Sequence, residues 1–401
     1  MSGRDPLLDY RDRFPILDST TYLISNSLGA MPRDAAEGLA RDAELWATRG
    51  VRAWAEEWWD LGARVADRVA PLLGAPPGSV SMQPSTTLAT AVVLSALRPG
   101  RERRKVVTTD LQFPSILHLL DGWCREHSAA LEILRREEGT WGVATERLLD
   151  AIDPTTAVVA LSHVEFATAW VNDAAVLARR CRETGAFLVL DVFQSAGVLP
   201  LALSDWGVDA AVGGCLKWLC GGPGNAFLYV DPDRALELEP TLTGWAAHAA
   251  PFAFEPPPMR WRAGGARFLN GTPQVPALYA AGPGLDILGE IGVDRVRAKS
   301  VKLTQRLCDE ALRRGFACSC AADPERRGGT VAVAVPEGER VARELLDRDV
   351  VIDYRPGFGI RIAPHFYNSW QECERCLDEI EAILADRTFE RHPSVAGARP
   401  T

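Results

Sequence analysis

Two charged side chains, Asp191 and Lys217, follow apolar runs of the sequence. Asp191 ends the run Phe187–Asp191, and Lys217 comes three residues after the run Ala210–Gly214. A carboxylate at the end of a buried strand either caps the next helix or pairs with a heterocyclic nitrogen. A lysine in a partly desolvated pocket has a lowered pKa and attacks aldehydes, whereas a solvated lysine does not. Together the two residues predict a pyridoxal 5′-phosphate (PLP) site, with Lys217 as the Schiff-base lysine and Asp191 on the pyridine nitrogen.

Three further groups of residues fit the same cofactor, although each has a simpler explanation on its own. The hydroxyls of Ser85, Thr86 and Thr87 precede an apolar helical stretch, so they form either a helix cap or a phosphate cradle. Phe113 follows a β-rich run and is either a core residue or a ring that stacks on the pyridine. Arg361 alternates with apolar residues, so it either faces solvent or enters a pocket, where its guanidinium would bind a carboxylate.

The middle of the sequence alternates short β-rich runs with helical stretches. The stretch Asn172–Gly185 begins with capping residues and stops at a glycine, as a crossover helix does. Such alternation predicts a mostly parallel sheet covered by helices on both faces, with the site at the carboxyl ends of the strands. The predicted strands are Val106–Thr109, Ala157–Ser162, Phe187–Asp191, Ala210–Gly214 and Ala226–Val230.

A Pro/Gly-rich connection over 251–265 precedes an α+β region, so we predict two domains with two flanking segments. Residues 1–45 are expected to pack on the small domain and the active site. Residues 46–265 would form the large PLP-binding domain, and 266–385 the small C-terminal domain. The polar tail, 386–401, is expected to be disordered. Within the small domain we predict helices at 294–314 and 339–347, strands at Thr330–Val335, Val350–Tyr354 and Gly359–Ala363, and a last helix that opens with the capping box Ser369–Glu372.

Composition excludes several classes of protein. A formal charge of −9 over 401 residues argues against a nucleic-acid or anionic-membrane surface. The sequence contains no run of 18 apolar residues, so no membrane span is predicted. The N-terminus has no apolar signal region, so a cytoplasmic location is expected. The odd number of cysteines, nine, suits buried thiols in a reducing compartment. Cys373 and Cys376 form a CxxC in a helical pattern without a second ligand pair, so no metal site is expected.

From about Tyr22 to Leu384 the sequence resembles the class V aminotransferase superfamily of fold type I PLP enzymes, and kynureninases within it. The resemblance implies an α/β fold, with a mostly parallel seven-stranded sheet in the large domain and a smaller α+β domain at the C-terminus. The motifs that carry it are Tyr22–Gly29, Trp58–Leu61, Ser85–Thr87, Phe113-Pro114, Leu161–Val164, Asp191–Gly197, Lys217 with Gly221–Gly224, Gly244–His248, Arg267–Thr272 and Arg361–Pro364.

The resemblance also implies a role for each matching residue. Lys217 would carry the cofactor and move the Cα proton of a small-molecule amino-acid substrate. The other cofactor contacts within the chain would be Asp191 on the pyridine nitrogen, Phe113 on the ring, Gln194 on the phenolic oxygen, and Thr86 and Thr87 on the phosphate. Thr272 would reach the phosphate across the interface of a homodimer with shared active sites, and the neighbouring Gly271 would also bind the cofactor. The substrate contacts would be Arg361 and Asn26 at its carboxylate, Trp245 in its pocket, and Ser27 beside Asn26.

Four positions depart from the kynureninase pattern. Kynureninases have Tyr before the lysine, His in the aspartate motif, and Asp after Phe-Pro-Ser, where this sequence has Leu216, Gln194 and Ile116. Their Asn-Tyr-Arg/Lys triplet is replaced by residues 165–167, Glu-Phe-Ala. We therefore expect a substrate other than kynurenine.

Three reactions and one non-enzymatic role stay open at this point. The first reaction is Cα deprotonation followed by cleavage of a bond at Cβ, either kynureninase-like hydrolysis or C–S β-elimination of a cysteine conjugate. The second is transamination, decarboxylation or oxidative deamination in a biosynthetic pathway, with dioxygen as a candidate oxidant. The third is cysteine desulfuration, which needs a nucleophilic cysteine on a mobile loop. A binding protein on an inherited PLP fold is disfavoured because Lys217, Asp191 and Arg361 are all present.

Overall fold

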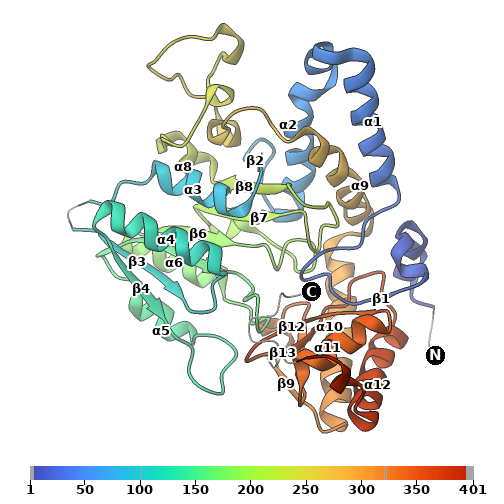
Figure 1. Ribbon diagram of the computed structural model, residues 1–401. Helices are drawn as coiled ribbons and strands as arrows, with labels where there is room; N and C mark the ends of the chain where they lie inside the picture. The colour runs from blue at the N-terminus through green and yellow to red at the C-terminus, as the bar shows by residue number, and fades with distance from the viewer. Residues whose placement is uncertain (1–3, 101, 320, 322, 394–401) are drawn as a thin grey trace.

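A seven-stranded sheet forms the centre of the computed structural model, which describes residues 4–100, 102–319, 321 and 323–393 (Figure 1). The strand order is β2-β8-β7-β6-β5-β3-β4, and all neighbours are parallel except the two pairs that β8 makes. The predicted mostly parallel sheet is therefore confirmed. Its strands are β2 (Val80–Gln83), β3 (Lys105–Thr109), β4 (Ala130–Leu134), β5 (Thr156–Ser162), β6 (Phe187–Asp191), β7 (Ala210–Gly214) and β8 (Ala226–Val230).

Helices cover both faces of this sheet because its central strands are apolar on both sides. On β5, Val158 and Ala160 belong to the hydrophobic cluster that contains α3 (Thr86–Ala96) and α4 (Pro114–His127). The alternate residues, Val159 and Leu161, belong to the cluster that contains α2 (Trp59–Val69), α6 (Ala174–Thr184) and α9 (Val275–Ile291). The first helix, α1 (Asp34–Arg49), packs against α9 and projects beside the sheet with α2 (Figure 1). The shorter helices are α5 (Thr145–Ala151), α7 (Leu203–Trp206) and α8 (Pro232–Glu237).

The predicted crossover helix is confirmed as α6. Asp173 caps it, because the Asp173 side chain accepts a hydrogen bond from the backbone N–H of Val176. Gly185 ends it with φ of 73°, a left-handed conformation that suits glycine. The helix thus brings the chain back so that β5 and β6 run parallel, with Ser162 opposite Asp191 at their carboxyl ends.

A second, antiparallel sheet of four strands lies toward the C-terminus, in the order β12-β13-β10-β9. Three helices pack with it in a separate hydrophobic cluster, and the capping box of the last helix is present as predicted. The strands are β9 (Ala317–Ser319), β10 (Val331–Ala334), β12 (Asp353–Arg355) and β13 (Gly359–Ile362), and the helices are α10 (Val293–Arg313), α11 (Gly338–Asp347) and α12 (Trp370–Asp386).

The prediction of one continuous strand over Val350–Tyr354 is wrong. Val350–Tyr354 is divided between β11 (Val350–Val351) and β12, which lie in different sheets. β11 pairs in parallel with β1 (Thr21–Tyr22), near the N-terminus, whereas β12 pairs with β13. The division arises because the N-terminal segment crosses to the C-terminal sheet, where the backbone of Ala363 also donates to Leu23 at 2.7 Å.

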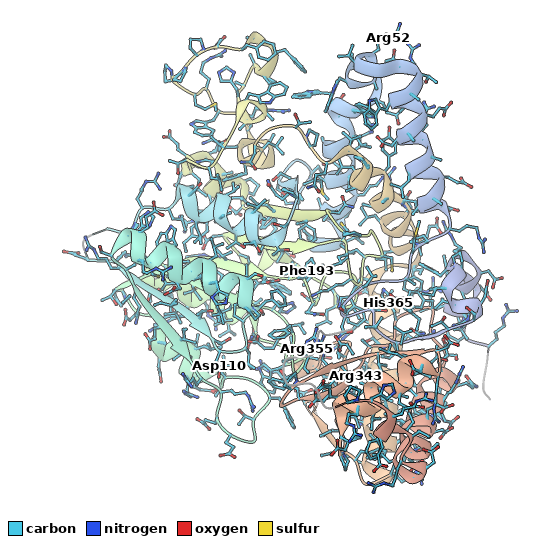
Figure 2. All side chains as sticks on the ribbon, in the orientation of Figure 1. Arg52, Asp110, Phe193, Arg343, Arg355 and His365 are labelled. Carbon is cyan, nitrogen blue, oxygen red and sulfur yellow. The ribbon has the colours of Figure 1, made fainter. Side chains whose placement is uncertain are left out.

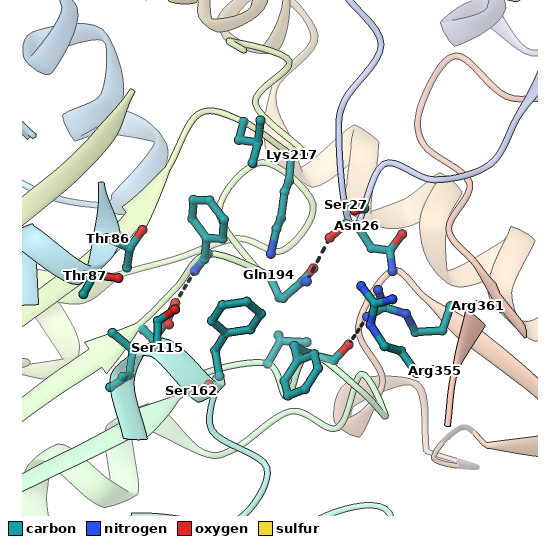
Figure 3. A pocket seen from close by; sticks show the side chains of 17 residues that line it. Asn26, Ser27, Thr86, Thr87, Ser115, Ser162, Gln194, Lys217, Arg355 and Arg361 are labelled. Carbon is teal, nitrogen blue, oxygen red and sulfur yellow. Dashed lines mark hydrogen bonds between the residues drawn. The ribbon is translucent and has the colours of Figure 1, made fainter. Parts of the chain in front are cut away.

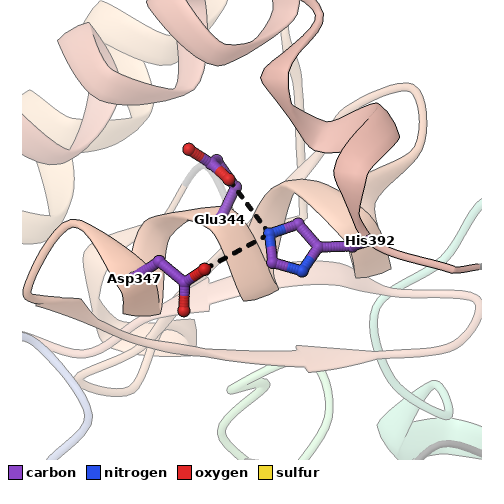
Figure 4. A group of neighbouring side chains, drawn as sticks. All are labelled: Glu344, Asp347 and His392. Atoms are coloured by element: carbon purple, nitrogen blue, oxygen red, sulfur yellow. Dashed lines mark hydrogen bonds and ion pairs between the residues drawn. The ribbon is translucent and has the colours of Figure 1, made fainter.

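The expected disorder of the polar tail is wrong for its first residues. A 3₁₀ turn at Thr388–Arg391 buries Phe389, and its neighbours hold Glu344 of α11, which is only 1% exposed. Arg391 donates to both carboxylate oxygens of Glu344, and His392 Nε2 lies 3.0 Å from one of them (Figure 4). Because arginines already fill this carboxylate, the Glu344, Asp347 and His392 group fastens the tail and is not a built metal site. Residues 394–401 of the tail lie outside the described part of the chain.

None of the helices in the described ranges has both the length and the apolar character that crossing a membrane requires.

Candidate functional site

A cavity of about 340 Å³ opens where the carboxyl ends of the large sheet meet the C-terminal sheet and the N-terminal segment (Figure 3). Its volume lies in the range of small-molecule sites. Figure 2 shows Phe193 on the side of the large sheet and Arg355 on the side of the C-terminal sheet. The lining residues are Asn26, Ser27, Thr86, Thr87, Phe113, Ser115, Ile116, Ser162, Val164, Phe166, Asp191, Phe193, Gln194, Leu216, Lys217, Arg355 and Arg361.

Lys217 projects into this cavity from the loop that follows β7. Its Nζ lies 4.1 Å from the centroid of the Phe193 ring and 5.9 Å from that of Phe113. No residue of the described ranges forms a hydrogen bond or ion pair with Nζ, although the lysine is only 9% exposed. Burial lowers the pKa of the amine to about 7, against the opposing effect of Asp191. A buried amine without a partner, with a substantial neutral fraction near pH 7, is suited to condense with an aldehyde.

Asp191 ends β6, the strand next to β7, so its carboxylate faces the same cavity. Its Oδ1 accepts a hydrogen bond from the backbone N–H of Phe193 at 2.9 Å, and its own carbonyl accepts one from His163 at 2.8 Å. Burial raises the pKa of this carboxyl, while the Phe193 N–H and Lys217 act in the opposite direction. Within the described residues nothing bonds Oδ2, so that oxygen is available to a ligand nitrogen.

The amino end of α3 forms one end of the cavity. Ser85 caps the helix through its side chain, which accepts from the backbone N–H of Leu88 at 3.2 Å. Thr86 and Thr87, the first two helical residues, line the cavity, so backbone N–H groups and hydroxyls gather there. A helix amino end with free N–H groups attracts anions and suits a phosphate.

The opposite end of the cavity is cationic. Arg361 reaches it from β13 and Arg355 from the end of β12, and both pair with the fully buried carboxylate of Asp353. Asn26 lies beside them, and neither atom of its buried side-chain amide has a partner in the described part of the chain. Sequence reasoning found Arg361 and Asn26 but missed Arg355 and Asp353. A charged residue inside the apolar run 350–354 was the available signal.

Aromatic and amide groups fill the space between the two ends. Phe113, at the start of α4, is 43% exposed, and its ring meets Phe166 edge to face at 5.3 Å between centroids. Phe193 also lines the cavity and was not predicted. Gln194 donates through Nε2 to the backbone oxygen of Asn26 at 2.9 Å and accepts from the Trp218 indole, which leaves one amide N–H for a ligand.

Three predicted site residues lie outside this cavity in the single chain. Gly271 and Thr272 are exposed, as residues that reach a partner's site would be. Trp245 stacks on Phe254 at 5.8 Å and packs on Trp59 at 5.2 Å, because the Pro-rich loop after it folds back over the ring. Their contacts with cofactor or substrate stay predictions, which now depend on a second copy of the chain.

The cysteines near Lys217 are shielded from the cavity. Cys215 and Cys220 are buried, and burial raises the pKa of each thiol to about 12. No cysteine of the described ranges lines the cavity. These thiols are packing residues, since a nucleophilic cysteine needs an accessible site that favours the thiolate.

The residues present fit PLP. The cavity offers an unpaired amine for the aldehyde, a carboxylate oxygen for the pyridine nitrogen and a helix amino end for the phosphate, and these come from three separate segments around the large sheet. Lys217, Asp191, Thr86, Thr87, Gln194 and Phe113 would hold the group, which leaves the arginine end of the cavity for substrate.

Comparison with known proteins gives the family from sequence and the fold from structure. The model of the aminotransferase class-V family matches residues 37–357. A kynureninase of Pseudomonas fluorescens is 34% identical over 97% of this chain and 95% of its own, and one of Burkholderia pseudomallei (strain K96243) is 31% identical over 94% and 93%. Among solved structures, an apo cysteine desulfurase from Thermococcus onnurineus NA1 superposes with a TM-score of 0.83 at 21% identity, covering 96% of this chain and 99% of its own. A mutant of the lyase C-DES, with glycine covalently linked to its PLP cofactor, also scores 0.83, at 22% identity and 92% and 98% coverage.

The structural neighbours share the fold, and the sequence relatives extend over nearly the full length of the chain. The fold and the full-length sequence similarity are both consistent with a cavity that contains Lys217 and Asp191. The chain therefore belongs to the aminotransferase class-V family and is a PLP-dependent enzyme.

Proposed function

We propose that the enzyme eliminates a thiolate from the Cβ of an S-substituted L-cysteine. The observation that supports this choice is the shortage of acid–base groups around Lys217. Apart from Asp191, which is reserved for the cofactor, and two arginines, Lys217 is the only titratable side chain lining the cavity in the described part of the chain. No His, Cys, Tyr or Glu side chain of the described residues lines it.

One base is enough for elimination. The Lys217 amine, with a pKa of about 7, takes the Cα proton. The Cβ–S bond then breaks, the electron pair leaves with sulfur, and the amino-acid remnant is released as pyruvate and ammonia after addition of water. A thiolate leaves without prior protonation because thiol pKa values lie near ~8.5. Hydrolysis of a Cβ–Cγ bond would also require a group that activates water, and such a group is missing from the lining.

The other lining residues position the substrate. Arg361 and Asn26 would hold its carboxylate, which fixes the amino acid relative to Lys217. PLP supplies an electron sink for the pair left at Cα, and Asp191 would keep the pyridine nitrogen protonated. The substrate side chain would then lie among Phe113, Phe166 and other apolar side chains, which suit an uncharged sulfur substituent.

We also propose a homodimer with shared active sites, located in the cytoplasm. Gly271, Thr272 and Trp245 are accessible and lie outside the cavity of their own chain, which supports a contribution to the site of a partner. The phosphate end would then be completed by the second copy.

The direct test is to incubate the holoenzyme with an S-aryl-L-cysteine whose thiolate is coloured and, in parallel, with L-kynurenine. We expect thiolate and pyruvate in equal amounts, little turnover of kynurenine, and neither product from Lys217→Ala. Release of anthranilate and alanine from kynurenine, without thiolate from the conjugate, would overturn elimination in favour of hydrolysis.

Kynureninase-type hydrolysis is the second candidate because the relatives that match over the whole chain carry that name. Cysteine desulfuration is less well supported, since the thiols nearest Lys217, Cys215 and Cys220, are buried. Turnover that survives Cys220→Ala would agree with this view.

A further inference from the structure

Two arginines share one buried carboxylate at the cationic end of the cavity. Asp353 and Arg361 face each other across the paired strands β12 and β13. Arg361 Nε donates to Asp353 Oδ1 at 2.7 Å, and its Nη2 donates to Oδ2. Arg355 approaches the same Oδ2 with its Nη2 at 3.2 Å. The Asp353 side chain is only 1% exposed, so its carboxylate interacts with these two arginines and hardly with solvent.

The group carries one positive charge in excess. The group contains two guanidinium cations and a single carboxylate, that of Asp353. No other acidic side chain in the described ranges pairs with either arginine. Because the arginines lie at a buried wall, with side-chain exposures of 23% for Arg355 and 2% for Arg361, this excess charge favours a bound anion.

Arg355 has more donors left for that anion than Arg361. Arg361 already gives three N–H groups to protein acceptors: two to Asp353 and one, through Nη1, to the carbonyl of Phe166 at 2.5 Å. Arg355 gives one, to the carbonyl of Tyr354 at 3.0 Å, and its 3.2 Å approach to Asp353 is an ion pair. A guanidinium has five N–H donors, so four remain on Arg355 and two on Arg361. Both arginines line the cavity next to the unpartnered amide of Asn26.

We propose that Arg355 is a second substrate-binding residue, which holds the substrate carboxylate jointly with Arg361, and that Asp353 is the positioning residue that keeps both guanidiniums in place. The inference rests on the proposed function, since it assumes that an amino acid enters this end of the cavity. One carboxylate balances the excess charge. A substrate with a single carboxylate and a neutral side chain therefore complements the wall, and a second anionic group has no counter-charge left there.

Neutralising this wall also affects Lys217. Arg361 and Arg355 both lower the pKa of the Lys217 amine, after the larger effect of burial. A carboxylate bound between them offsets their charge, so the amine becomes a stronger base once substrate is present. Substrate binding and proton abstraction are then linked through the same two side chains.

Arg355 can be tested without losing the buried ion pair. In Arg355→Gln, Asp353 keeps both of its hydrogen bonds from Arg361, so no buried charge is left alone. Arg355→Lys retains the charge and loses the planar fork. Arg136→Gln is the matched control, because Arg136 lies 5.4 Å from the ring of Phe358, in the turn that follows Arg355, and does not line the cavity.

The experiment measures binding of L-alanine and of ethylamine to the PLP-loaded variants through the change in cofactor absorption. Both probes have an amine, but only L-alanine has a carboxylate. We expect Arg355→Gln to weaken L-alanine binding about 10- to 100-fold, the range for a lost charged hydrogen bond, and to leave ethylamine binding unchanged. Arg355→Lys should recover part of the loss, and Arg136→Gln should match the wild-type protein.

The possible results separate the inference from the proposed function. Equal L-alanine affinity in the wild-type protein and Arg355→Gln would refute the role of Arg355 and leave the proposed function standing. An equal loss for both probes would show a structural role and would also overturn the inference. Failure of L-alanine to bind the wild-type holoenzyme would overturn both together.

Discussion

Replacing Glu165 by glutamine is expected to stabilise the folded protein near neutral pH. The Glu165 side chain is 1% exposed, and its Oε1 accepts from Asn172 Nδ2 at 2.9 Å. Its Oε2 has no partner in the described part of the chain. Burial raises the pKa of this carboxyl from 4.5 to about 8, and the nearby Asp191 adds to the rise. The group is therefore protonated in the folded chain at pH 7 and ionised in the unfolded chain.

The size of the effect follows from this difference in protonation. Because the pKa is raised on folding, the contribution of Glu165 to stability is fully present below pH 4.5 and is lost as pH rises toward 8. At pH 7 the loss spans about 2.5 pH units, or about 3 kcal/mol in the free energy of unfolding. Glutamine has nearly the shape of the neutral acid and cannot ionise, so Glu165→Gln avoids this loss. The gain should be about 3 kcal/mol at pH 7 and close to zero at pH 4.

Urea unfolding of both proteins at several pH values from 4 to 8, followed by the fluorescence of the twelve tryptophans, measures the gain. Glu138→Gln is the control, since Glu138 is exposed and should show no pH-dependent gain. A stability difference that stays constant with pH, or a variant that is less stable than the wild-type protein at pH 7, would refute the reasoning.

Three further outcomes are expected. The rate at which the cofactor-free chain binds PLP, followed by absorption near ~420 nm, should rise with pH through about 7 and then level off, because only the neutral Lys217 amine attacks the aldehyde. A midpoint near the ordinary lysine pKa of 10.5 would contradict this. Thr87→Ala should weaken PLP binding about 10-fold in equilibrium dialysis, and unchanged binding would argue against the helix amino end as the phosphate site. Asp353→Asn should lower the free energy of unfolding by about 3–5 kcal/mol in urea titrations, since it leaves the buried Arg361 and the half-buried Arg355 without a counter-charge, whereas a loss below about 1 kcal/mol would show that the pair is not needed for stability.

The sequence was most informative where local chemistry decides structure. β6, β7 and β8 have the predicted bounds, because each is an apolar run that ends at a turn signal. The capping residues of α6 and α12 also predicted where those helices begin. Lys217 and Asp191 lie on adjacent strand ends in one cavity because a parallel sheet places the carboxyl ends of its strands together.

What the sequence did not predict depends on contacts between distant segments. The run 350–354 reads as one strand, and its division becomes apparent only when the N-terminal β1 pairs with its first half. Phe193 and Arg355 enter the cavity through loop and strand-end geometry that no periodicity encodes. The pairing of Asp353 with Arg361 could have been inferred, since Asp353 is the lone charge in the run 350–354 and Arg361 the lone charge in the run 359–363. Two such runs pair most favourably with their charges opposed.

The joining of β1 to β11 has a consequence for how the enzyme selects a reaction. Asn26 follows a backbone bridge between Ile24 and Ala363, so it is tied to the sheet that carries Arg355 and Arg361. Asp191 ends β6 and Lys217 follows β7, so both are positioned by the large sheet instead. A small rotation between the two sheets would turn the substrate as a rigid body over a stationary cofactor. In the proposed binding mode, the bond at Cα that is presented for cleavage would thus depend on the angle between two sheets as well as on single side chains.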